Sequence, residues 1–424
     1  MKKKFLPLIL ATLSLFTLSG CSLFDDSDLA IHNEYNPITD NTEEDDPNAV
    51  YAGGVKAKDN ENVPNAYCFK NIGYSTNETI INTYKEGGVN HTLYNVNNGE
   101  DYFANKSNNN FDLYVPKNLD KNEKHVVILF IHGGAWVSGF KTDVNSYVHE
   151  FANKGYITAT IKYTLLKRSM DDSSLSIFRD LDEIDACVSM IKSCLEELKF
   201  DTTKTNLVVG GASSGAHLAM LYSYSRGNNA PLPIKFIVDA VGPVNIKPDS
   251  WKRFSEINDE ILSSGLSYSA IEKQKIAGNL TELAIAGDTH NWTQYQTMRI
   301  ANGMCGLPYT LDEVKASTTD EIYITNPTEA SNSMTQVGGG EDLLSVTHYI
   351  SATNNIPIIC AYAGRDSIVG IAQFAKLEQS LIANGVEYEY FYFKDSDHTE
   401  ITEEKNPTQY NAFIEKIDEW CKNL

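Results

Sequence analysis

Residues 205–219, TNLVVGGASSGAHLA, decide the fold because they join an apolar run to a helical pattern through the motif G-x-S-x-G. The run at 205–210 predicts a buried strand, and residues 214–224 predict a helix. Glycines are needed on both sides of Ser213 where a strand turns sharply into a helix and leaves no room for Cβ atoms. The motif therefore predicts an exposed, nucleophilic Ser213, with a plain Gly/Ser turn as the alternative.

Strand and helix patterns alternate on both sides of this motif. Residues 126–131 form a continuous apolar run, which is typical of a parallel strand buried on both faces. Further strands are predicted at residues 111–116, 156–163, 234–241, 357–363 and 388–393, and further helices at 175–199, 370–384 and 409–421. This order predicts a doubly wound α/β fold, in which a mostly parallel sheet carries helices on both faces. Short β-like runs from about residue 65 are expected to add an antiparallel edge.

More than a hundred residues separate the strands predicted at 234–241 and 357–363. A compact domain does not usually contain so long a loop without structure of its own. We therefore predict a helical cap at about residues 247–345, with a hinge near the glycine run 338–340. This run has neither the Lys nor the Ser/Thr of a phosphate-binding loop, so nucleotide binding is not expected.

A serine nucleophile needs a histidine as its base, and the histidine needs an acid that holds its tautomer. Asp366 directly follows one predicted strand, and His398 follows the last one. Because the carboxyl ends of parallel strands meet at one edge of a sheet, both side chains are expected beside Ser213. The alternatives are an aspartate that caps the next helix and a loop histidine without a role. His290 and His348 are further candidate bases, but neither follows a core strand.

The segment 132–136, HGGAW, lies in the loop after an apolar strand, where oxyanion-binding loops of this kind occur. Donors for the oxyanion must already point at it before the reaction begins. The predicted donors are the backbone N–H groups of Gly133, Gly134 and Ser214. His132 is expected to shape this loop beside the substrate pocket. Trp136 is expected to form a wall of the acyl pocket, with core packing as the alternative.

Residues 1–20 have the composition of a secretory signal: three lysines, an apolar run and then small residues. The tetrapeptide Leu-Ser-Gly-Cys at 18–21 is similar to the bacterial lipobox, whose cysteine is acylated. We therefore expect Cys21 to be a lipid anchor and the protein to lie outside the cytoplasm, at the bacterial cell surface. The alternative is an ordinary signal peptide with a chance cysteine. Residues 21–64 are rich in Asp, Glu, Asn and Pro and predict a flexible tether, which leaves residues 65–424 as the catalytic domain.

The chain of 424 residues has a formal charge of −21, so nucleic acid is not expected as a partner. The chain has seven cysteines, six of them besides Cys21. Cys187 and Cys194 lie on one predicted helix, roughly 10 Å apart along its axis, which is too far for a disulfide. The spacing of cysteines and histidines does not match a zinc site. Apolar filling of the core is the predicted role of most cysteines.

Four motifs occur in the order that is typical of one enzyme family. They are HGGAW at 132–136, GASSGAHLA at 211–219, AGRDSIV at 363–369 and DSDH at 395–398. Across roughly residues 65–424, the chain resembles the hormone-sensitive-lipase type of carboxylesterase and bacterial esterases that act on acylated carbohydrates. The resemblance implies the α/β-hydrolase fold. The esterase reaction expected of this fold needs no metal or organic cofactor. Two departures leave the substrate open: the long segment between Ser213 and Asp366, and Tyr163-Thr164 where the family has Tyr-Arg.

These observations favour a two-step hydrolysis of carboxylic esters. Ser213 attacks the carbonyl, His398 transfers the proton, Asp366 orients the imidazolium, and water releases the acyl group. The expected substrates are short-acyl esters outside the cell, such as acetylated or feruloylated sugars. Amide, peptide or arylformamide hydrolysis by the same triad stays open, because one fold serves many reactions. A binding lipoprotein without catalytic activity is the alternative from another class. His217 is expected to pack in its helix, without a catalytic part.

Overall fold

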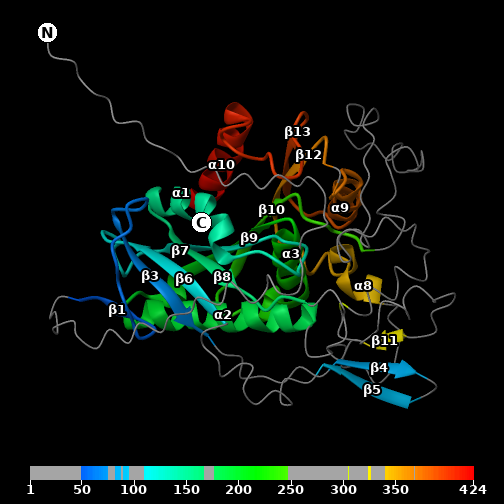
Figure 1. Cartoon of the computed structure of the whole chain (residues 1–424), viewed down its shortest axis with the longest axis horizontal. Helices are drawn as coiled ribbons and strands as arrows, with labels where there is room; N and C mark the ends of the chain where they lie inside the picture. The colour runs from blue at the N-terminus through cyan, green and yellow to red at the C-terminus, as the bar shows by residue number, and fades with distance from the viewer. Residues whose placement is uncertain are drawn as a thin grey trace, which may run out of the picture.

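The computed structural model describes residues 49–74, 82–86, 89–94, 109–166, 176–246, 304, 323–325, 340–366 and 368–424. An eight-stranded sheet forms its centre (Figure 1). In sheet order the strands are β13 (Tyr388–Phe393), β12 (Ile358–Ala363), β10 (Ile234–Ala240), β9 (Thr205–Ala212), β7 (His125–Ile131), β8 (Ile157–Lys162), β6 (Asn110–Pro116) and β3 (Ala66–Gly73). The strands from β13 to β8 pair in parallel, and β6 pairs antiparallel with β8 and β3. The predicted doubly wound sheet with an antiparallel edge is confirmed.

Helices cover both faces of this sheet, as Figure 1 shows. On one face lie α2 (Ile177–Glu197), α3 (Ser214–Arg226) and α9 (Ala372–Ala383), and on the other lie α1 (Asn145–Asn153) and α10 (Pro407–Lys422). Short 3-10 helices are η3 (Lys141–Val144), η4 (Thr202–Lys204), η5 (Gly227–Asn229) and η9 (Val346–His348). None of the helices within the described ranges is long and apolar enough to cross a membrane.

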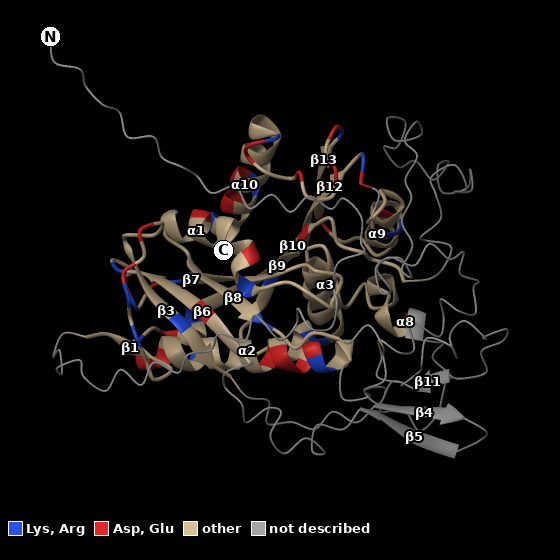
Figure 2. Ribbon diagram, in the orientation of Figure 1, with Lys and Arg blue, Asp and Glu red and all other residues tan. Residues whose placement is uncertain are grey.

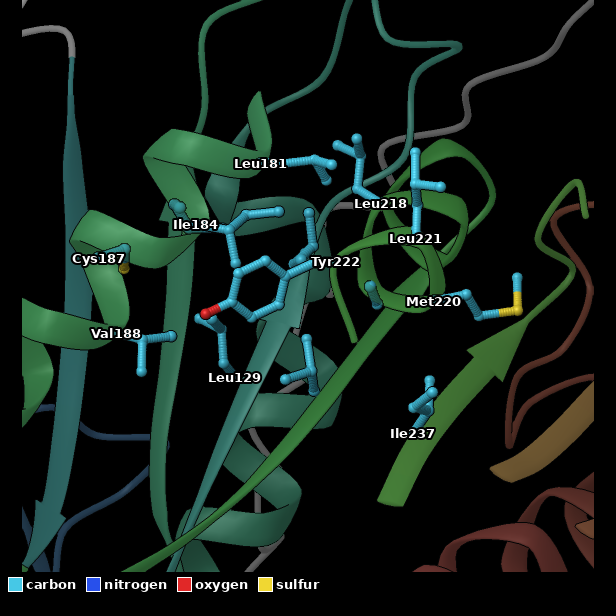
Figure 3. Close-up of a cluster of buried hydrophobic side chains, with 14 of the residues drawn as sticks. Leu129, Leu181, Ile184, Cys187, Val188, Leu218, Met220, Leu221, Tyr222 and Ile237 are labelled. Atoms are coloured by element: carbon cyan, nitrogen blue, oxygen red, sulfur yellow. The ribbon is translucent and has the colours of Figure 1, made fainter. Parts of the chain in front are cut away.

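Residues 126–131 of strand β7 are all apolar because both faces of the strand are buried. Its side chains alternate between two hydrophobic clusters: Val127, Leu129 and Ile131 join one, and the residues between them join the other. Figure 3 shows Leu129 in the first cluster, beneath Tyr222 of α3 and Ile184 of α2. Each large apolar side chain buried in this way contributes about 1.5–3 kcal/mol. Both faces of the strand therefore stabilise the fold.

Helix α2 is two residues shorter at each end than the prediction of 175–199. The hydroxyl of Ser176 caps its first turn by accepting a hydrogen bond from the N–H of Arg179 at 3.3 Å. Charged residues lie along the helix (Figure 2). Two of them, Arg179 and Glu183, are buried and form an ion pair one helical turn apart. The helix therefore carries charge into the core as well as on its surface.

The cysteines of the described segments fill apolar space. Five of them are free and buried, as predicted: Cys68, Cys187, Cys194, Cys360 and Cys421. Burial raises the pKa of Cys194 to about 12 and that of Cys421 to about 12, which keeps both thiols protonated and unreactive. Cys21 and Cys305 lie outside the described residues.

The segment 49–64 corrects the predicted domain boundary. Instead of belonging to a tether, it forms a hairpin of β1 (Tyr51–Ala52) and β2 (Val55–Lys56) on the catalytic domain. The side chain of Ala52 is fully buried, and the N–H of Gly53 donates to Glu197 of α2 at 2.8 Å. Only Ala52 and Val63 of its apolar side chains are buried, which is too small a pattern to predict this packing from sequence. Residues 1–48 lie outside the described part of the chain.

The predicted cap at 247–345 lies mostly outside the described residues. Within it, the structure places Met304, which is buried, β11 (Tyr323–Thr325) and α8 (Gly340–Leu344). Strand β11 pairs with β4 (Asn82–Glu86), and β4 pairs with β5 (Val89–Tyr94). The helical cap thus stays a prediction for most of this range, and one short strand lies within it. Strands β4 and β5 do not extend the main sheet. A local pattern could not predict that these two distant segments pair.

Candidate active site

Ser213 occupies a sharp turn between β9, which ends at Ala212, and α3, which begins at Ser214. Its φ of 54° and ψ of −126° lie outside the backbone regions that residues other than glycine normally adopt, so the backbone is strained at this residue. A Cβ atom on Gly211 would lie 2.3 Å from the carbonyl carbon of Gly215. The turn therefore excludes any side chain at Gly211, as the motif predicted.

His398 and Asp366 meet Ser213 at the carboxyl edge of the sheet. His398 Nε2 lies 2.9 Å from Ser213 Oγ, and His398 Nδ1 lies 2.7 Å from Asp366 Oδ2. Because a carboxylate accepts, Nδ1 carries the proton, and Nε2 is left to accept from the serine hydroxyl. The imidazole side chain is 11% exposed, whereas the Asp366 side chain is completely buried. The structure thus brings the three predicted residues together in the geometry of a catalytic triad.

Asp366 uses its two carboxylate oxygens for different purposes. Oδ1 accepts hydrogen bonds from the N–H groups of Ile368 and Val369, both at 2.8 Å. Oδ2 contacts His398. The capping role considered as an alternative is therefore present at the same time as the contact with histidine. It holds the carboxylate in a fixed orientation.

The loop after β7 lies directly against the nucleophile. A Cβ atom on Gly133 would approach the carbonyl oxygen of Ala212 to 2.8 Å and Ser213 Cβ to 3.0 Å. Within the described segments, the N–H groups of Gly133 and Gly134 donate no hydrogen bond. The N–H of Ser214 belongs to the first turn of α3, where helical N–H groups lack intrahelical acceptors. Gly133 and Ser214 therefore lie directly beside the nucleophile, and Gly134 is the next residue of the same loop.

His132 is buried beneath this loop. Its Nδ1 lies 2.8 Å from the carbonyl oxygen of Gly133, and its ring stacks on Tyr163 with the centroids 4.4 Å apart. Burial lowers the pKa of His132 to about 4, so the ring is neutral and is not a base in the reaction. The Tyr163 hydroxyl also donates to the carbonyl oxygen of His132 at 3.2 Å. The predicted loop-shaping role therefore depends on Tyr163, to which the sequence had assigned no function.

Trp136 lies in the core and is 1% exposed. Its Nε1 donates to His217 Nδ1 at 3.2 Å, and His217 Nε2 then donates to the carbonyl oxygen of Leu344 at 2.7 Å. Burial lowers the pKa of His217 to about 4, which keeps this ring neutral. The structure supports core packing of Trp136 rather than the predicted pocket wall. The His217 side chain of α3 is buried in the core, as expected. Its two hydrogen bonds also connect α3 with the loop of Trp136 and with α8.

Of the remaining predicted site residues, the structure describes only His348. His348 ends η9, and its ring packs against Tyr349 rather than against Ser213. His290 and the predicted anchor Cys21 lie outside the described residues.

Residues 111–280 match the BD-FAE family model. The matched range contains the HGGAW loop and Ser213, and it ends before Asp366 and His398. The match covers 170 of the 424 residues of the chain. The described segments have the sheet order of the α/β-hydrolase fold. Asp366 and His398 join Ser213 from outside the matched range, in the loops after strands β12 and β13.

Among curated proteins, this chain is similar to fungal polyketide synthases of much greater length. It is 22% identical over 343 residues to the non-reducing polyketide synthase Preu3 of Preussia isomera. This match covers 74% of this chain and 13% of the synthase. It is 23% identical over 320 residues to the non-reducing polyketide synthase prhL of Penicillium brasilianum, which covers 68% of this chain and 12% of that protein. The chain therefore spans about an eighth of the length of these relatives.

Solved structures similar to this chain include two bacterial esterases. Esterase B from Lactobacillus rhamnosis has a TM-score of 0.46 and 14% sequence identity, and the likeness covers 83% of this chain and 91% of that one. A bacterial heroin esterase has a TM-score of 0.47 and 13% identity, covering 83% and 86%. A bifunctional GH43-CE protein of Bacteroides eggerthii has a TM-score of 0.46 and 16% identity, covering 74% of this chain and 33% of that one.

Proposed function

We propose that this hydrolase cleaves carboxylic esters through an acyl-enzyme intermediate. The observation that carries the proposal is the 2.9 Å contact between His398 Nε2 and Ser213 Oγ. At this distance the imidazole takes the hydroxyl proton while the oxygen attacks the ester carbonyl. Asp366 stabilises the imidazolium that forms, and the imidazolium then donates its proton to the leaving alcohol.

The N–H groups of Gly133, Gly134 and Ser214 stabilise the negative oxygen of the tetrahedral intermediate in this proposal. A donor of this kind contributes about 3–4 kcal/mol to transition-state stabilisation. In the second step His398 removes a proton from water, the hydroxide attacks the acyl carbonyl, and Ser213 leaves as the restored alcohol. The reaction needs only the side chains and N–H groups named here.

Short-acyl esters of carbohydrates are the proposed substrates. The proposal is supported by the order of the four motifs, which resembles that of bacterial esterases acting on acylated carbohydrates. It is tested by comparing kcat/KM for acetylated and feruloylated oligosaccharides with kcat/KM for p-nitrophenyl acetate. Higher kcat/KM for arylformamides or peptides than for every ester would overturn it.

A lipid anchor on Cys21 is the proposed means of attachment to the bacterial cell surface. The lipobox-like residues 18–21 and the preceding apolar run support it. Mass spectrometry of the protein purified from membranes should find an N-terminal, lipid-modified Cys21. Unmodified Cys21, or unchanged membrane attachment of the Cys21→Ala variant, would contradict the anchor.

The esterase is tested by the hydrolysis of p-nitrophenyl esters from acetate to decanoate. Ser213→Ala should abolish turnover and labelling by a fluorophosphonate probe. Ser225→Ala is the matched control, because its hydroxyl donates to the carbonyl oxygen of Leu221 within the same helix and lies outside the triad. No turnover and no labelling of the wild type would overturn the enzymatic reading and favour a binding lipoprotein.

A further inference from the structure

The loop that contains Gly133 returns to its own beginning before η3 starts. The N–H groups of Val137 and Ser138 donate to the carbonyl oxygen of Gly134 at 3.1 Å and 2.9 Å. Gly139 has a φ of 102°, and a Cβ atom there would lie 2.2 Å from the carbonyl oxygen of Gly133. Gly139 therefore packs directly against Gly133, which lies beside Ser213. Because the two backbones are in close contact, a shift of the chain at Gly139 is expected to displace Gly133 as well.

Lys141, two residues later, fixes this end of the loop to the antiparallel edge of the sheet. Its Nζ donates to Asn71 Oδ1 at 2.5 Å, Asn110 Oδ1 at 2.6 Å and Asp112 Oδ1 at 2.6 Å. The lysine side chain is 11% exposed and that of Asp112 is 2% exposed. Three oxygen acceptors satisfy the three donors of the ammonium group, so its position is fully determined.

Asp112 binds a second lysine that does not belong to the loop. Lys70 Nζ on β3 donates to Asp112 Oδ2 at 2.9 Å, and the Asn71 N–H donates to Asp112 Oδ1 at 2.8 Å. Burial alone would raise the pKa of Asp112, but Lys141 and Lys70 outweigh it and hold that pKa below its ordinary value. The carboxylate therefore stays charged and binds both ammonium groups. Only one of them is attached to the oxyanion loop.

We propose that Lys141 is a positioning residue for the oxyanion hole, held in place by Asp112, Asn110 and Asn71. The inference rests on the proposed function, in which the N–H groups of Gly133 and Gly134 bind the oxyanion. Lys141 does not touch the substrate. It acts through the contact between Gly139 and Gly133, which sets the distance from the loop donors to the developing negative charge.

The two lysines on Asp112 provide a matched pair of variants. Lys141→Met and Lys70→Met each remove one positive charge from the same carboxylate, and both are expected to lower the free energy of unfolding. In Lys141→Met, kcat for p-nitrophenyl acetate should fall by about 10- to 100-fold, less than the loss of a whole oxyanion donor. KM should change less than about twofold, because the loss concerns the transition state. In Lys70→Met, kcat should stay within about twofold of the wild type.

A trifluoromethyl ketone tests the oxyanion hole separately from stability. This inhibitor forms a tetrahedral adduct with the serine. The former ketone oxygen of the adduct is negatively charged and occupies the oxyanion hole. Its inhibition constant should rise in Lys141→Met by the same factor by which kcat falls, and it should not change in Lys70→Met. A residue that only stabilises the fold would leave the inhibitor affinity of the folded enzyme unchanged.

Asn110→Ala decides the matter if Lys141→Met fails to fold. It removes one acceptor of the Lys141 ammonium without changing a charge, and a several-fold loss in both kcat and inhibitor affinity is expected. Equal kcat and inhibitor affinity in this variant and the wild type would overturn the inference. So would equal losses in Lys141→Met and Lys70→Met. A wild type that hydrolyses no ester would instead overturn the proposed function, and this inference with it.

Discussion

Asp366 and Asp239 are two buried aspartates at the carboxyl ends of strands β12 and β10, which pair with each other in the sheet. Asp366 contacts His398 and accepts two backbone N–H groups, as described above. Asp239 accepts from the N–H of Gly242 at 2.8 Å and from the hydroxyl of Tyr362 at 2.7 Å. Both carboxylates have hydrogen-bond partners, but only one has a histidine.

The difference between these partners separates a catalytic acid from a structural one. Burial raises the pKa of Asp239 to about 7, although the hydrogen bonds from Tyr362 and Gly242 oppose this shift. A position at the end of a parallel strand is therefore not sufficient for catalysis. The loop after β13 must also bring His398 to the carboxylate, and it does so only at Asp366.

The largest expected effect is that of Asp366→Asn. The amide no longer holds the tautomer in which His398 Nε2 accepts the serine proton, so kcat should fall by about 10⁴-fold. Ester hydrolysis at saturating substrate measures it, with circular dichroism as the control for folding. A loss of less than about tenfold would mean that His398 works without this acid.

The pH dependence of the free energy of unfolding tests whether folding raises the pKa of Asp239. Its pKa rises from 3.8 to about 7 on folding, so the folded state binds more protons between these values. The stability contributed by protonated Asp239 is complete below the unfolded value and is lost as the pH rises through the folded value. The free energy of unfolding of the wild type, relative to Asp239→Asn, should therefore fall by roughly 4 kcal/mol from the lower to the upper value. Chemical denaturation measures it, and a constant difference would contradict the raised pKa.

Tyr362→Phe should have a smaller effect on stability. The hydroxyl oxygen lies 2.7 Å from Asp239 Oδ2 and 2.7 Å from the carbonyl oxygen of Gly242, so its one proton can be donated to either acceptor. Its loss leaves two buried acceptors with one donor fewer, which costs about 1–3 kcal/mol in the free energy of unfolding. Tyr388→Phe is the matched control, because its hydroxyl donates to Glu378 in a less buried place. Equal losses in the two variants would show that burial of the Asp239 pair adds nothing.

The smallest effect is expected for Asp239→Asn on catalysis. Among the described residues, the Asp239 carboxyl group has no hydrogen bond to the triad, so kcat/KM for p-nitrophenyl acetate should stay within about threefold of the wild type. The same assay as for Asp366→Asn measures it. A large loss would show that Asp239 supports the reaction and would remove the contrast between the two strand ends.

The sequence alone predicted the elements that repeat a local pattern. The continuous apolar run of β7 and the spacing of α2 follow from burial on one or two faces, so both were predicted within a few residues. Helix α1 was missed, because only four of its nine side chains are buried and its first residues are polar. The motif around Ser213 was informative because crowding at the turn admits only glycine at Gly211.

Tertiary structure decided the contacts between segments that are distant in sequence. Sheet register places Ala363 beside Phe393, so the loops after β12 and β13 start together and Asp366 reaches His398. The contact of Lys141 with Asp112 joins residues that are 29 positions apart, and no periodicity of either segment encodes it. Local patterns report which face of an element is buried, whereas strand order and register determine which polar groups meet. For that reason the sequence could name the catalytic candidates, but only the folded chain shows which groups hold them in place.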